Sequence, residues 1–103
     1  MDVQRKVRLE RVLEEIEQHK HSIDKLEEIL LREYRLEGGD SVEHADKSYG
    51  WNLKHTIKDQ LREYKQCKNK KYLSNYYTLF IDTFKQDVSK ELFKINIQSG
   101  ASG

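Results

Sequence analysis

Proline is absent from the 103-residue sequence, cysteine occurs once, and glycine occurs only five times. Because proline is the residue that most strongly interrupts a helix interior, its absence favours long helices. The lone cysteine, Cys67, cannot form an internal disulfide or a multi-cysteine zinc site. We therefore expect a helical protein of a reducing compartment, with a cytoplasmic location.

Long hydrophobic runs are also lacking. No stretch approaches the roughly 18 consecutive apolar residues of a membrane-spanning helix, and the N-terminal residues lack the apolar segment of a secretory signal. The sequence contains no glycine-rich phosphate loop and no G-x-S-x-G serine motif. We therefore expect no membrane association and no enzyme activity, and we expect neither a cofactor nor a metal or catalytic site.

The charged residues are as numerous as the hydrophobic ones, at 36% each. A globular domain usually has about 45–50% apolar and about 25% charged residues, so this balance is typical of long, exposed helices. The length suits one domain. We assign residues 1–97 to a single all-helical domain and residues 98–103, which are small and polar, to a disordered tail.

The first half predicts one helix over about residues 3–36. A heptad stripe supports it, with steps of three and four residues, and consists of Leu9, Val12, Ile16, His19, Ile23, Leu26 and Leu30. His19 is the polar member. It either fixes the register from a buried position or lies partly exposed where the stripe is interrupted. The helix is expected to end at Gly38 and Gly39, which suit a C-terminal cap.

Residues 37–51 predict a loop, with one lysine against four carboxylates and no lasting periodicity. Helix connections usually have about 2–8 residues, so this length marks the loop as a candidate functional element. Tyr49 and Trp51 are its candidate partner-binding residues, because large aromatic side chains are typical anchors at interfaces.

A second helical arm is predicted over about residues 52–95, with Asn52 as its N-cap. The polar segment near 67–75 leaves two interpretations open, one unbroken arm or two helices with a kink or break there. We expect an all-α, long antiparallel helical hairpin that assembles into a dimeric four-helix bundle. A monomeric three-helix bundle is the alternative.

The second arm also has more aromatic residues than one helix seam can cover. We assign four of them to association, so that the candidate partner-binding set comprises Tyr49, Trp51, Tyr76, Tyr77, Phe80 and Phe84. The sequence thus favours a non-enzymatic helical protein–protein interaction module, which acts as a small regulator, adaptor or inhibitor. Its predicted partners are an unidentified protein and a second copy of the chain.

Residues 52–103 carry ten lysines and arginines but only five carboxylates. Five of these cations follow one another at steps of four or three residues, namely Lys54, Lys58, Arg62, Lys65 and Lys68, and Lys70 and Lys71 continue the row. Such a basic ridge is either a solvated helix face or a surface for phosphate contacts that do not depend on base sequence. The alternative function is therefore a small nucleic-acid-binding regulator.

Overall fold

The computed structural model describes the backbone of residues 3–102 and the side chains of residues 3–98, and its regular elements are all helical. In chain order, the elements are α1 (Val3–Gln18), α2 (Ile23–Leu36), the 3₁₀ turn η1 (Gly39–Ser41), α3 (Tyr49–His55), the π-helical turn η2 (Thr56–Leu61), α4 (Arg62–Gln66) and α5 (Lys70–Ser102). Because α3, η2 and α4 follow one another without interruption, the described residues form four helical segments. The predicted all-α class is confirmed.

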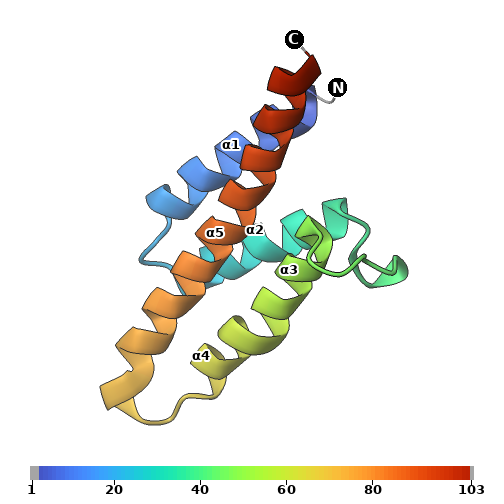
Figure 1. The fold of residues 1–103 in the computed structure, drawn as a ribbon. Coiled ribbons are helices and arrows are strands. Elements are labelled where there is room, and N and C mark those ends of the chain that lie inside the picture. Colours follow the sequence, from blue (N-terminus) through green and yellow to red (C-terminus); the bar gives the residue numbers. More distant parts are fainter. Residues whose placement is uncertain (1–2, 103) are drawn as a thin grey trace.

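The longest helix, α5, organises the molecule. Its 33 residues span about 50 Å at 1.5 Å per residue, which matches the longest dimension of the chain, 51 Å. In Figure 1, α1 runs antiparallel to the C-terminal half of α5, and the α3–α4 segment also runs along α5. Helix α4 lies beside the N-terminal half of α5, and α3 reaches residues 89–94 of its C-terminal half. Helix α2 crosses the molecule and contacts both α1 and α3. Each shorter helix therefore buries its apolar stripe against α5 or against another short helix.

The hydrophobic core contains residues from every one of these segments. Its buried members are Leu9, Val12, Ile16, Leu26, Ile29, Leu30, Tyr34, Tyr49, Leu53, Leu61, Phe80, Phe84, Val88 and Leu92. Five residues of the predicted heptad stripe are among them. The core is thus formed within one chain, because Phe80 and Phe84 of the second arm belong to the same buried cluster as the apolar residues of the first half.

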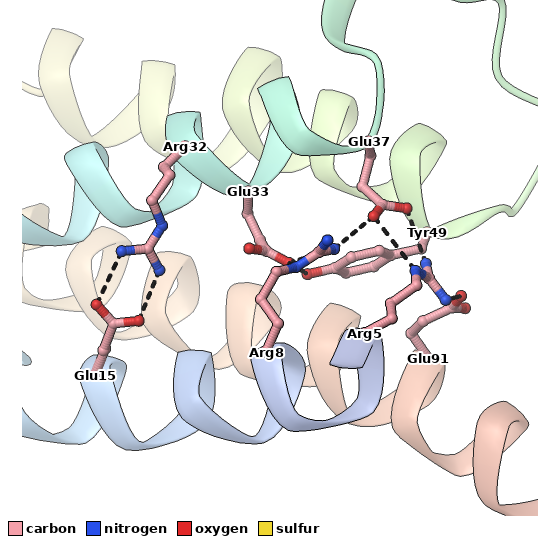
Figure 2. Close-up of polar contacts among 8 residues, drawn as sticks. All are labelled: Arg5, Arg8, Glu15, Arg32, Glu33, Glu37, Tyr49 and Glu91. Carbon is pink, nitrogen blue, oxygen red and sulfur yellow. Dashed lines mark hydrogen bonds and ion pairs between the residues drawn. The ribbon is translucent and has the colours of Figure 1, made fainter. Parts of the chain in front are cut away.

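The prediction of one helix over residues 3–36 is wrong, because the chain turns at 19–21 and starts a new helix. Ser22 is the N-cap of α2, and its Oγ accepts a hydrogen bond from the Lys25 backbone N–H. The turn brings α2 back toward α1, where Arg32 donates two hydrogen bonds to Glu15, at 2.6 and 3.0 Å (Figure 2). These bonds lower the pKa of Glu15. His19 lies half-buried in the turn, not in a continuous seam.

The start of the second arm also differs from the prediction. Helix α3 begins at Tyr49, three residues before the expected Asn52, because the Ser48 hydroxyl caps it by accepting a hydrogen bond from the Trp51 N–H at 3.2 Å. The predicted loop is shortened further by η1. Gly38, with φ at 97°, does end α2 in the left-handed conformation that glycine allows.

The second arm consists of two helical segments with a break between Gln66 and Lys70, which agrees with the interpretation of a break near residues 67–75. Helix α4 ends at Gln66, and α5 begins at Lys70 after the extended Cys67. The Asn69 side chain accepts a hydrogen bond from the Lys71 N–H at 2.9 Å, which caps the new helix. At its other end α5 continues to Ser102, whereas a disordered tail from Gln98 was expected, and Gly103 lies outside the described residues.

Candidate interaction surface

A buried ionic network at the end of α2 fixes the relative positions of three helices (Figure 2). Its centre is Glu33, which is fully buried. Glu33 Oε1 lies 3.1 Å from Arg8 Nη2 and accepts a hydrogen bond from the Tyr49 hydroxyl, also at 3.1 Å. Burial raises the pKa of Glu33, although Arg8 and Tyr49 favour its charged form. This network ties α1 to α2 and to the start of α3.

Glu37 extends this network toward α5. It accepts hydrogen bonds from Arg5 at 2.8 Å and Arg8 at 2.6 Å, and Arg5 also lies 2.8 Å from Glu91 on α5. Burial acts to raise the pKa of Glu37, but the two arginines outweigh it and the pKa is lowered. Because Tyr49 is enclosed by this network and only 3% exposed, it does not lie on the surface as expected for a partner-binding residue.

The four aromatic residues of α5 that were assigned to association differ in how far they are buried. Phe80 and Phe84 are fully buried in the core of the chain itself, so they are not available to a partner. Tyr77 is half-buried and donates a hydrogen bond to the Lys20 carbonyl at 2.6 Å, so it holds the turn between α1 and α2. Tyr76 is half-buried, and so is Trp51, whose ring centroid lies 3.9 Å from that of His55. Of the six predicted partner-binding residues, Tyr76 and Trp51 are thus the two that are partly exposed and whose side chains make no hydrogen bond of the kind that Tyr77 makes.

A second apolar stripe, which the sequence interpretation missed, lies on the solvent side of α5. It contains four large apolar side chains that are 46–66% exposed, namely Tyr72, Leu79, Phe93 and Ile97. With the residues between them they follow alternating steps of four and three, and we call the whole set the outer α5 face, consisting of Tyr72, Tyr76, Leu79, Thr83, Gln86, Lys90, Phe93 and Ile97. This spacing is that of a helix that packs along another helix.

A groove between α3 and α5 adjoins the outer α5 face. It has a volume of about 810 Å³, and its lining includes Trp51 and Phe93. Three lysines, Lys47, Lys90 and Lys94, also line it, and none of the carboxylates among the described side chains does. Since Lys90 and Phe93 belong to both features, the groove and the outer α5 face form one continuous surface at the C-terminal end of α5.

The predicted basic ridge is divided among several elements. Lys54 lies in α3, and Lys58 lies in the π-helical turn η2. Because a π-helical turn is wider than an α-helical one, the residues after it are displaced from the regular α-helical spacing. Lys65 forms an ion pair with Glu27 at 2.6 Å. The helix then ends at Gln66, so the remaining three lysines lie in the connection or on α5. The seven cations therefore do not form one uninterrupted helix face.

Other candidate sites are not assembled by the fold. Among the described residues no group of three or more histidine, cysteine or acidic side chains is placed to hold a metal ion. Cys67 Sγ lies 3.3 Å from the Asn69 carbonyl oxygen and so belongs to the connection before α5. None of the described helices combines the length and apolarity that crossing a membrane requires.

Comparisons with family models, with curated proteins and with solved structures found no match to this chain.

Proposed function

We propose that this chain is a non-enzymatic helical protein–protein interaction module, a small cytoplasmic regulator, adaptor or inhibitor, and that it associates through the outer α5 face. The observation that carries this proposal is the exposed heptad spacing of Tyr72, Leu79, Phe93 and Ile97. An apolar stripe at this spacing on a helix that already buries another stripe suits a further helix. We further propose that this helix is α5 of a second copy.

The order of residues along the outer α5 face is self-complementary in an antiparallel pair. If Thr83 of one copy lies opposite Gln86 of the other, Tyr72 meets Ile97 and Tyr76 meets Phe93 at both ends of the pair. Twofold symmetry repeats every contact. Tyr72, Tyr76, Phe93 and Ile97 thus gather at the two ends, and Thr83 and Gln86 lie near the symmetry axis.

Charge supports the same register. Lys90 would lie opposite Leu79 of the second copy and within reach of its neighbour Asp82. Asp82 is exposed on α5. The groove beside Lys90 would receive the tyrosines of the second copy, whose rings are favourable neighbours for Lys90 and Lys94.

The first test is the molecular mass in solution. Light scattering at micromolar concentration should give twice the 12.3 kDa of the chain, and Leu79→Lys should return it to one copy, because a lysine there would lie opposite Lys90 of the second copy and repel it. Thr78→Lys is the matched control, since Thr78 is exposed beside the outer α5 face. A monomer at all concentrations, with full helical content, would refute the dimer.

The second test addresses the register. In a Cys67→Ser background, a chain with Leu79→Cys is mixed with a chain with Lys90→Cys under mild oxidation. The antiparallel pair predicts a disulfide-linked dimer in the mixture, whereas either chain alone should stay unlinked. A rapid link in the Leu79→Cys chain alone would show a parallel pair.

Nucleic-acid binding is the second candidate, and the observation that favours it is that Lys54, Lys58 and Arg62 form no ion pair among the described residues. Changing Lys58, Arg62 and Lys65 to glutamine should alter stability by no more than about 0.5 kcal/mol per site and leave association unchanged. Titration with generic DNA at two salt concentrations separates the candidates. Steeply salt-dependent binding that the triple change weakens would favour nucleic acid over the interaction module.

A further inference from the structure

A second cavity, which shares no lining residue with the groove beside α5, is lined by several positive charges. It has a volume of about 260 Å³ and lies between the end of α2, the turn η1 and the α3–η2 segment. Arg35 lines it from α2, whereas Lys54 and Lys58 line it from the α3–η2 segment. Among the described residues none of these three side chains has a hydrogen-bonded or ion-pair partner. Three charges that repel one another thus face a common space.

The same cavity contains one carboxylate, which is already engaged. Asp40 accepts a hydrogen bond from the Tyr34 hydroxyl at 2.7 Å. Burial and, as the smaller cause, the negative charge of Asp40 raise the pKa of Tyr34 to about 12. The Tyr34 hydroxyl therefore remains a hydrogen-bond donor at neutral pH. Asp40 balances only one of the three positive charges, so the cavity keeps an excess of positive charge. Leu31 and Ile57 supply an apolar lining beside it.

The wall formed by η1 is fixed by backbone geometry. Gly38 and Gly39 both have positive φ, at 97° and 53°. A Cβ at Gly38 would lie 2.5 Å from Val42 Cγ2, so no larger residue fits there without movement. The Gly39 carbonyl lies 3.0 Å from His44 Nε2. These contacts hold the turn against the cavity, which keeps the site preformed and lowers the ordering cost of binding.

The opposite wall contains the π-helical turn. Ile57 and Lys58 both belong to it. Such turns are rare and frequently lie at functional sites. This one places an apolar and a cationic side chain beside the same cavity.

We propose that this cavity binds a small organic anion, a phosphate monoester or a carboxylate with a compact apolar body. Arg35, Lys54 and Lys58 contact the anionic group, and Leu31 and Ile57 contact the body. The volume lies just below the roughly 300–1,000 Å³ of typical small-molecule pockets, which suits a compact metabolite and not a polymer. The site shares no residue with the outer α5 face, so it does not depend on the dimer.

Phenyl phosphate and benzoate are the probes, with phenol as the matched uncharged compound. Methyl NMR signals of Leu31 and Ile57 report binding. We expect saturable shifts with at least one of the two anions and none with phenol. The anion that binds more tightly identifies the phosphate or the carboxylate class. The absence of saturation with both anions would overturn the proposal.

Variants separate this site from general attraction to a basic protein. Arg35→Gln with Lys54→Gln should weaken binding at least tenfold. Lys68→Gln with Lys71→Gln removes the same charge from exposed positions outside the cavity and should leave binding within twofold. Equal losses in the two double variants would overturn the site. Leu79→Lys should bind the anion as the unaltered protein does, so a failed dimer test leaves this result unaffected.

Discussion

Replacing Phe84 with alanine should lower the free energy of unfolding by about 3–5 kcal/mol, the usual cost of removing a buried phenyl ring. The ring is fully buried, and its centroid lies 6.4 Å from that of Phe80. It belongs to the central part of α5, where the other helices meet. Because small domains have about 5–15 kcal/mol of total stability, the variant should unfold at much lower urea concentration, which circular dichroism would measure.

Phe93→Ala is the control for this change, because Phe93 lies on the same helix but is 66% exposed. Its effect on the unfolding of the single chain should stay near 0.5 kcal/mol, whereas its association should weaken. A Phe84→Ala protein with unchanged stability would mean that the core of α5 is assigned to the wrong stripe. The comparison thus tests both stripes of one helix.

The apolar stripe of the first half was predictable because burial follows helical periodicity. Leu9, Val12, Ile16, Leu26 and Leu30 are all buried. The same periodicity concealed the turn at 19–21, since the spacing continues across the break in phase. The local signal for this turn is Ser22, which follows three polar residues and caps α2. The chain turns there because α2 thereby gains contacts with both α1 and α3.

The candidate surfaces were harder to predict for a related reason. One helix can carry two heptad stripes, and the sequence does not say which stripe the rest of the chain covers. The more apolar stripe, with Phe80 and Phe84, was assigned to association, whereas the fold buries it and leaves Leu79 and Phe93 outside. The cavity could not be inferred at all, because Arg35 and Lys54 become neighbours only through the crossing of α2 and α3.

A buried carboxyl group should make the stability of this protein depend on pH. Asp87 on α5 is only 6% exposed and accepts a hydrogen bond from the Thr56 hydroxyl. Burial raises the pKa of Asp87 to about 6, although Thr56 and the nearby Lys90 favour its charged form. In the unfolded chain the value is about 3.9. The folded state therefore binds the proton more tightly than the unfolded state does.

The difference in the pKa of Asp87 between the folded and the unfolded state sets the direction in which the free energy of unfolding changes with pH. Below about pH 4 the carboxyl is protonated in both states, and it costs no stability. Between about pH 4 and pH 6 the folded state holds more protons, so the free energy of unfolding falls as the pH rises. Above about pH 6 both states are ionised, and the full cost remains. Two pKa units correspond to about 3 kcal/mol.

Asp87→Asn should remove this cost, because the asparagine carbonyl still accepts the Thr56 hydrogen bond without a charge. At pH 8 the variant should be more stable by up to about 3 kcal/mol, whereas at pH 4 the two proteins should be nearly equal. Urea unfolding at fixed protein concentration between pH 4 and 8 measures the difference, and subtraction cancels the other titrating groups. Asp46→Asn, at an exposed position of the loop before α3, should give a parallel curve. If Asp87→Asn also runs parallel to the unaltered protein, Asp87 is solvated and the contact between η2 and α5 is looser than its geometry indicates.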